Sequence, residues 1–92
     1  MLKIVPSNRF KKDLKKAIKR NLDISLLDEV VNKLANNKKL EKKYKDHGLK
    51  GDYIGYRECH IEPDWLLLYR IEKEELELFL FRTGSHGDIF KQ

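Results

Sequence analysis

The sequence predicts an α+β fold in which two antiparallel N-terminal helices pack on a twisted antiparallel sheet of about four strands, followed by a short C-terminal tail. Apolar residues recur at three- and four-residue spacing between residues 10 and 34, as in amphipathic helices. From residue 53 the pattern changes to the alternation and short apolar runs of strands. A chain of 92 residues is the size of one domain, which we expect to span residues 1–92.

The first helix is predicted from its cap. Residues 2–5 form a short apolar segment that we interpret as a strand ended by Pro6. Ser7 follows as a plausible N-cap, and we expect the helix to run to about Arg20. Its inward stripe consists of Phe10, Leu14, Ala17 and Ile18.

The second helix is predicted after the break at residues 21–24. Ser25, with Asp28 three positions later, is similar to a capping box in which Asp replaces the usual Glu. We expect this helix to end near Asn36–Asn37. Its inward residues are Leu27, Val30, Val31 and Leu34.

Three strands are predicted after a polar connector over residues 38–51. Residues 53–61 alternate in polarity, residues 65–71 form a nearly continuous apolar run, and residues 77–82 alternate again. The predicted turns between them are residues 62–64 and 72–75.

The similar lengths of the last two strands suggest a register. Pairing Ile71 with Leu76 would place Trp65 opposite Arg82. The tail then leaves the sheet at Gly84, beside the 62–64 turn. Connectivity therefore gathers five side chains at one end of the sheet: His60, Asp64, Trp65, Arg82 and His86.

The charge of the chain is unevenly distributed. Residues 1–50 carry 15 Lys or Arg against 6 Asp or Glu, whereas residues 51–92 carry 5 against 9. A lysine-rich half suits phosphate binding, because cations replace condensed counterions along a nucleic-acid backbone. Solvated outer helix faces explain the same lysines equally well.

The side chains at the sheet end suit metal-free cleavage of a phosphodiester. RNA carries its own nucleophile, the 2′-hydroxyl, so an enzyme needs a base, an acid and cations. Histidine fits either proton-transfer role because its pKa lies near neutrality. Asp64 could serve as a base or orient a histidine, and Arg82 is the candidate phosphate clamp. Trp65 either stacks on a base or packs in the core.

Neither a metal site nor a cofactor is predicted. Cys59 and His60 are adjacent on a strand, so their side chains should point to opposite faces. The chain has no C-x-x-C or H-E-x-x-H spacing. We interpret Cys59 as a small buried hydrophobe.

Two phenylalanines mark the sheet face opposite the helices. Phe79 and Phe81 alternate with leucines that face the core. Their face either binds a partner or is covered by Ile89 and Phe90 of the tail.

Three blocks, YKDHGLKG, GYRECHIEPDWLLLY and RTGSHGDIF, follow the two helices in that order. Together they resemble the YafQ branch of the RelE/ParE toxin superfamily, and the specific part of the resemblance is residues 44–90. It implies a RelE-like fold and the toxin of a type II toxin–antitoxin system. Such toxins are ribosome-dependent endoribonucleases that cut mRNA in the ribosomal A site without metal, which stops translation and growth.

The resemblance also implies roles for individual residues. His86 matches the family's proton donor, and Asp64 becomes the candidate base. His47, His60 and Arg82 are expected to hold the phosphate. The candidate substrate-binding residues are Trp65, Phe90, Lys45 and Lys50.

The partners implied by the resemblance are mRNA on the 70S ribosome and a DinJ/RelB-like antitoxin. The toxin–antitoxin complex would bind its own operator DNA through the antitoxin. We expect a cytoplasmic protein, since one cysteine allows no internal disulfide, with no membrane partner and a monomeric free toxin.

Two alternative functions remain. A ParE-like toxin that inhibits gyrase without chemistry would leave the histidines and Asp64 without a purpose. A plain RNA- or ribosome-binding module would account for the lysines but not for acid and histidine at one sheet end.

Overall fold

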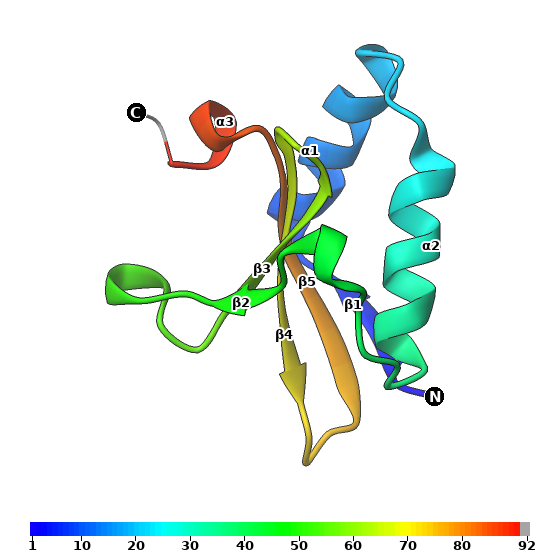
Figure 1. Ribbon diagram of the computed structural model, residues 1–92, viewed down its shortest axis with the longest axis vertical. Helices are drawn as coiled ribbons and strands as arrows, with labels where there is room; N and C mark the ends of the chain where they lie inside the picture. Colours follow the sequence, from blue (N-terminus) through cyan, green and yellow to red (C-terminus); the bar gives the residue numbers. More distant parts are fainter. Residues whose placement is uncertain (91–92) are drawn as a thin grey trace.

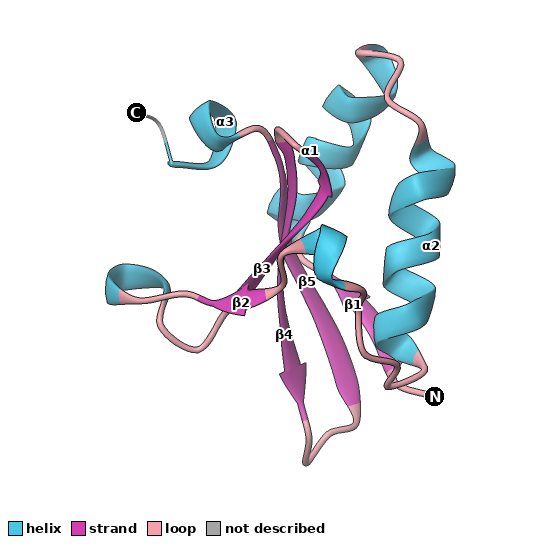
Figure 2. Cartoon of the chain, viewed as in Figure 1, coloured by secondary structure: helices cyan, strands magenta, loops and turns pink. Residues whose placement is uncertain are grey.

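A five-stranded sheet, in the order β1-β5-β4-β3-β2, forms the centre of the computed structural model, which describes residues 1–90 (Figure 1). Helices α1 and α2 lie on one side of the sheet and the short helix α3 on the other (Figure 2). The strands are β1 (Lys3–Pro6), β2 (His47–Gly48), β3 (Arg57–Glu62), β4 (Trp65–Glu72) and β5 (Glu77–Gly84). The helices are α1 (Asn8–Lys19), α2 (Ile24–Ala35) and α3 (His86–Phe90), with the 3-10 turns η1 (Lys42–Tyr44) and η2 (Gly51–Tyr53).

The predicted fold class is confirmed, but the sheet is mixed rather than antiparallel. Strand β1 runs parallel to β5, with Ile4 opposite Leu78. Its four residues show that a strand exists but carry no information about the direction of a partner more than 70 residues away. Strand β2 was not predicted. It has only two residues and lies in the polar connector, where no apolar alternation could indicate it.

The helix caps follow the predicted chemistry in one case and depart from it in the other. Ser7 caps α1, and its Oγ accepts a hydrogen bond from the backbone N of Phe10 at 2.9 Å. The prediction for α2 was wrong, because its cap is Asp23 rather than Ser25. The Asp23 carboxylate accepts from the backbone N of Ser25 at 3.0 Å, so an earlier acceptor starts the helix.

The predicted register of β4 and β5 is also wrong. Ile71 lies opposite Leu78, and Arg82 lies opposite Leu68. Two local features cause the difference. Leu76 takes a left-handed conformation, φ 55°, in the turn rather than in the strand, and a bulge between Leu68 and Tyr69 shifts the pairing by one residue.

Two clusters of apolar side chains pack on the two faces of the sheet. The larger one fills the space between the sheet and α1 and α2 and includes Phe10, Leu27, Val30, Leu67, Tyr69 and Leu78. The smaller one has Leu66, Leu68 and Ile89 at its centre, with Phe81 and Phe90 packed against them. The tail therefore covers part of the aromatic face, which is one of the two outcomes that the sequence left open. In residues 1–90, no helix has the length and apolar character that a membrane crossing requires.

Candidate active site

Strand β3 turns Glu58 and His60 away from the helices. Their neighbours Cys59 and Ile61 are buried in the larger core, at 0% and 8% exposure. Because side chains alternate along a strand, Glu58 and His60 lie on the opposite face, as the sequence predicts for His60. Burial raises the pKa of the Cys59 thiol to about 12, which argues against this cysteine as a nucleophile.

Glu58 is a buried carboxylate between two histidines. It is 6% exposed, and its Oε2 lies 3.0 Å from Nε2 of His47 and 3.9 Å from Nε2 of His60. His47 reaches this position because β2 pairs it directly with Glu58. Glu58 is not among the residues predicted from the sequence. The signal that could have found it is its spacing of two from His60 on the same strand face.

The hydrogen bonds of the other ring nitrogens fix how a proton can be held here. Nδ1 of His47 lies 2.7 Å from the carbonyl of Lys45, and Nδ1 of His60 lies 3.2 Å from the carbonyl of Pro63. A carbonyl only accepts, so both Nδ1 atoms must donate. Nε2 then carries a hydrogen only when the ring is protonated. A hydrogen bond between Nε2 of His47 and Glu58 therefore requires an additional proton on one of the two groups.

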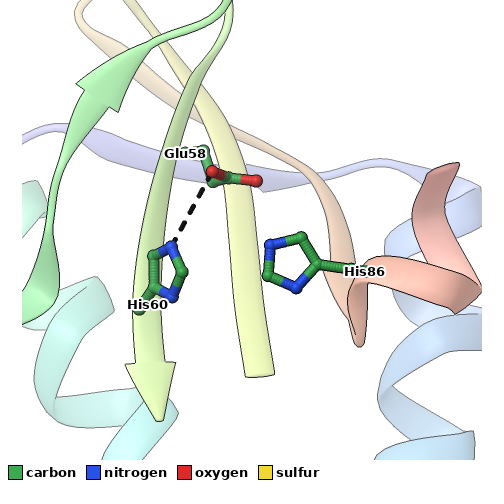
Figure 3. A group of neighbouring side chains, drawn as sticks. All are labelled: Glu58, His60 and His86. Carbon is green, nitrogen blue, oxygen red and sulfur yellow. Dashed lines mark ion pairs between the residues drawn. The ribbon is translucent and has the colours of Figure 1, made fainter. Parts of the chain in front are cut away.

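His86 faces this cluster from the start of α3. Its ring centroid lies 5.7 Å from that of His60, and both rings and Glu58 point into the same space (Figure 3). Nδ1 of His86 donates to Oδ1 of Asp64 at 3.0 Å, and the backbone N of His86 donates to the same oxygen at 3.2 Å. These bonds lower the pKa of Asp64, the side-chain bond being the larger cause. Within residues 1–90, Nε2 of His86 makes no hydrogen bond.

Helix α1 holds the start of α3 in place. The carboxylate of Asp88 pairs with Arg20 at 2.7 Å and with Lys16 at 3.3 Å. It also accepts from the backbone N of Ser85 at 3.2 Å, while Ser85 Oγ accepts from the backbone N of Asp88 at 3.1 Å. This reciprocal cap fixes the turn that carries His86. The hydrogen bond from Arg20 is the main reason that the pKa of Asp88 lies well below its usual value.

Arg82 and Trp65 do not join the histidines. Arg82 is 8% exposed and makes two hydrogen bonds to Asp13 of α1, from Nε at 2.7 Å and from Nη2 at 3.2 Å. Trp65 is 3% exposed, and its Nε1 donates to Oγ1 of Thr83 at 2.9 Å. Of the two roles that the sequence left open for Trp65, the structure shows core packing.

The remaining predicted residues lie around the cluster. Phe90 is half-buried and contacts His86 at 6.4 Å and Tyr53 at 5.3 Å between ring centroids. Lys45 and Lys50 are exposed, and the carbonyl of Lys45 supports His47. The structure thus brings together His47, His60, Asp64, His86 and Phe90.

Three of these side chains also form a possible metal-binding group. One atom each from Glu58, His60 and His86 lies within 4.8 Å of the other two. Two imidazoles and a carboxylate suit first-row divalent ions. This group has no short ligand spacing that the sequence could reveal, because its members come from β3 and from α3.

The family described as "Bacterial toxin of type II toxin-antitoxin system, YafQ" matches residues 2–91. The mRNA interferase toxin YafQ of Escherichia coli (strain K12) is 41% identical over 85 residues, covering 91% of this chain and 90% of that protein.

Solved structures of the same kind superpose closely. A metal-bound toxin from Helicobacter pylori has a TM-score of 0.93 and 51% identity, covering 98% of this chain and 100% of that chain. The toxin fold in an E. coli DinJ–YafQ complex has a TM-score of 0.88 and 40% identity, covering 98% and 99%. The family match spans nearly the whole chain, which therefore belongs to the YafQ family of bacterial type II toxins.

Proposed function

We propose that this chain is the toxin of a type II toxin–antitoxin pair and that it cleaves mRNA as an endoribonuclease. Its E. coli relative is named an mRNA interferase toxin. The observation that carries the proposal is the placement of His86, held by Asp64, opposite the Glu58–His60 pair. A proton donor and a proton acceptor thus face one another.

The proposed reaction is an internal transfer within the RNA. The 2′-oxygen forms a bond to the adjacent phosphorus while the bond from phosphorus to the 5′-oxygen breaks. A base removes the 2′-hydroxyl proton, and an acid delivers a proton to the leaving 5′-oxygen. The products are a 2′,3′-cyclic phosphate and a 5′-hydroxyl, so no metal or external nucleophile is consumed.

His86 is the proposed general acid. Asp64 accepts the hydrogen of Nδ1 and stabilises the positive ring, which lets Nε2 give its proton to the 5′-oxygen. Because Asp64 makes both of its hydrogen bonds to His86, we assign it to positioning His86 rather than to the base role that the sequence suggested.

Glu58 is then the proposed base. Its buried carboxylate has two histidines within 4 Å that can take up or share the proton. His47 and His60, when protonated, also supply the positive charge that stabilises the phosphorane. Lys45 and Lys50 extend that charge along the RNA, and Phe90 offers a ring beside His86 for base stacking.

In this proposal Arg82 and Trp65 stabilise the site without contacting the RNA. Arg82 holds Asp13 of α1, and Trp65 holds Thr83 at the end of β5. Both interactions fix the segment that leads into His86.

We place the substrate in the ribosomal A site of the 70S ribosome, as the family resemblance implies, and the protein therefore in the cytoplasm. The proposed inhibitor is an antitoxin like the DinJ protein that accompanies the E. coli relative. The complex would bind operator DNA through the antitoxin, and the free toxin would act as a monomer.

A divalent ion would bind Glu58, His60 and His86, whose donor atoms converge. The similar toxin from H. pylori is described as metal-bound. In this chain the ion would occupy the proposed base and acid. Such an ion would inhibit cleavage rather than assist it.

The decisive experiment changes His86 to Gln. Brief induction of the variant in cells should stop neither growth nor translation, whereas mapping of mRNA 5′ ends should show codon-specific cuts for the parent protein alone. Antitoxin binding should be retained, because His86→Gln removes the proton donor and little volume. Unchanged cleavage in the variant would contradict the proposal. DNA breaks with intact mRNA would indicate the gyrase alternative, and ribosome binding without cuts by the parent protein would indicate a plain binding module.

A further inference from the structure

A continuous run of aromatic rings leads away from the histidines across the sheet face opposite α1 and α2. The ring of His86 contacts Phe90, which meets Tyr53 edge-on at 5.3 Å between centroids. Tyr53 in turn lies 6.4 Å from Phe81 on β5. The same face carries Glu58 and His60, so the run begins inside the proposed active site.

The run ends at Arg70, whose guanidinium lies over two of the rings. Tyr56 stacks on Phe81 with centroids 4.4 Å apart and planes 19° apart. The guanidinium of Arg70 lies 4.8 Å from the centroid of Tyr56 and 5.2 Å from that of Phe79. Arg70 also pairs with Glu72, and β4 and β5 place it directly opposite Phe79. We call these side chains the aromatic strip: Phe90, Tyr53, Phe81, Tyr56, Phe79 and Arg70.

The strip remains accessible to solvent. Each of its six side chains is half-buried, whereas Leu78 and Leu80, which alternate with its phenylalanines on β5, are 0% and 3% exposed. The apolar cluster beneath the strip is filled by Leu66, Leu68 and Ile89. Tyr53, Phe81 and Phe90 pack against this cluster. Because each strip side chain is only half-buried, its exposed surface is available to a ligand.

We propose that the aromatic strip binds nucleotides of the single-stranded RNA next to the scissile phosphate, an inference that rests on the proposed function. Unpaired bases stack on Phe, Tyr and Arg side chains, and this recognition tolerates any base. Arg70 lies four residues along β4 from Leu66, the partner of His60, or about 13 Å at the rise of a strand. The strip thus reaches nucleotides beyond the one being cut, and Arg70 contacts a phosphate there.

An antitoxin segment is the rival occupant of this face. Two features favour RNA. The strip is continuous with His86 and Phe90, so a strand cut at the histidines is guided directly onto it. Its members are planar, and one is a cation that lies over two of the rings, which suits flat bases and phosphates better than aliphatic side chains.

The first test measures cleavage in a reconstituted translation system with one defined codon in the A site. Tyr56→Leu, Phe79→Leu and Arg70→Gln each keep some packing volume but remove a planar group. Each should raise KM by about tenfold, since stacking contributes roughly 1–3 kcal/mol per base, and leave kcat within about twofold. Tyr56→Phe keeps the ring and should recover most of the affinity. Lys39→Gln, at an exposed lysine after α2, controls for the loss of one positive charge and should match the parent protein.

The second test uses the unmodified protein and so does not depend on the folding of variants. Messenger RNA with 5-iodouridine at positions flanking the cut is irradiated on ribosomes with the toxin, and crosslinked peptides are mapped by mass spectrometry. Crosslinks to Tyr53, Tyr56, Phe79 or Phe81 are expected. Crosslinks confined to α1 or to His86 would overturn the inference.

The outcomes separate the two proposals. If the parent protein cuts mRNA but the three strip variants keep its KM, the strip is not an RNA surface and the proposed function stands. If the three strip variants instead lose antitoxin binding, measured as Kd by calorimetry, this face binds the antitoxin and the inference is wrong. If the parent protein cuts no mRNA at all, both proposals fail.

Discussion

Asp64 at the β3–β4 corner lies 3.0 Å from Nδ1 of His86 at the start of α3, although 22 positions separate them in sequence. The same oxygen accepts from the backbone N of His86, so this one carboxylate fixes both the ring and the helix start. The corner and the tail thereby form a single unit, and the orientation of the proposed acid depends on a residue in a different element.

Asp64→Asn should lower kcat by about tenfold to a hundredfold and change KM little. The amide keeps an oxygen for Nδ1 but removes the charge that stabilises a protonated His86. Single-turnover cleavage on ribosomes measures the effect. Asp64→Ala, which removes both, should be more severe. Equal kcat for Asp64→Asn and the parent protein would contradict the positioning role.

Glu58→Gln should lower kcat more than Asp64→Asn, by about a hundredfold or more, because general base catalysis typically contributes 10²–10⁴-fold. The substitution keeps the volume of a buried side chain, so the thermal midpoint should change little. The same single-turnover assay compares the two variants side by side. The reverse order, with Asp64→Asn the more damaging change, would return the base role to Asp64.

Asp88 should give the toxin an acid-sensitive tail. Its folded pKa is lowered, so its contribution to stability is complete above the ordinary carboxyl pKa of about 3.9 and is lost as the pH falls through the folded value. Unfolding free energies measured by urea denaturation should therefore decline between about pH 5 and pH 2 in the parent protein.

Asp88→Asn should remove part of that decline and cost about 1 kcal/mol at neutral pH, the usual worth of a helix cap. Glu74→Gln, in the exposed β4–β5 turn, is the matched control and should leave the pH profile unchanged. A profile for Asp88→Asn identical to that of the parent would show that the tie to α1 contributes nothing.

Substitution of Arg82 tests whether this arginine stabilises the fold or binds the phosphate of the RNA. Arg82→Ala should destabilise the fold by about 3 kcal/mol, because it leaves the partly buried Asp13 without its partner. Changing Asp13 and Arg82 together should cost less than the sum of the single changes. Denaturation and cleavage are measured on the same samples. Full stability with lost cleavage would instead support the clamp that the sequence suggested.

Divalent copper or nickel should inhibit cleavage, and EDTA should restore it. The ion would bind Glu58, His60 and His86 and block both proton-transfer groups. His60→Gln should weaken the affinity for the metal, measured by calorimetry, independently of any loss of activity. Cleavage that requires an added metal would contradict the proposed mechanism.

The sequence predicts what depends on neighbours along the chain and misses what depends on distant ones. The Ser7 cap, the hairpin corner at residues 62–64 and the opposed faces of Cys59 and His60 are local, and all three are confirmed. Glu58 was missed because its partner His47 arrives through a two-residue strand. The partner of Arg82, Asp13, lies 69 residues away, and no pattern in the sequence links them.

The site chemistry follows the same division. Clustering of His60, Asp64 and His86 at one sheet end needs only the order of the strands, so it survives an incorrect register. The orientation of the His47 and His60 rings depends on which ring nitrogen donates to which backbone carbonyl. The positions of those carbonyls are set only when the chain is folded.

The parallel pairing of β1 with β5 joins segments from opposite ends of the described chain. Without β5, strand β1 loses the strand with which it pairs, and Asp13 loses its ion pair with Arg82. The turn that carries His86 then has no strand before it to position it. Contacts at such long sequence separation also form slowly. A fragment that lacks β5 should therefore neither fold nor cleave mRNA, because strand β5 joins both ends of the described chain to the sheet.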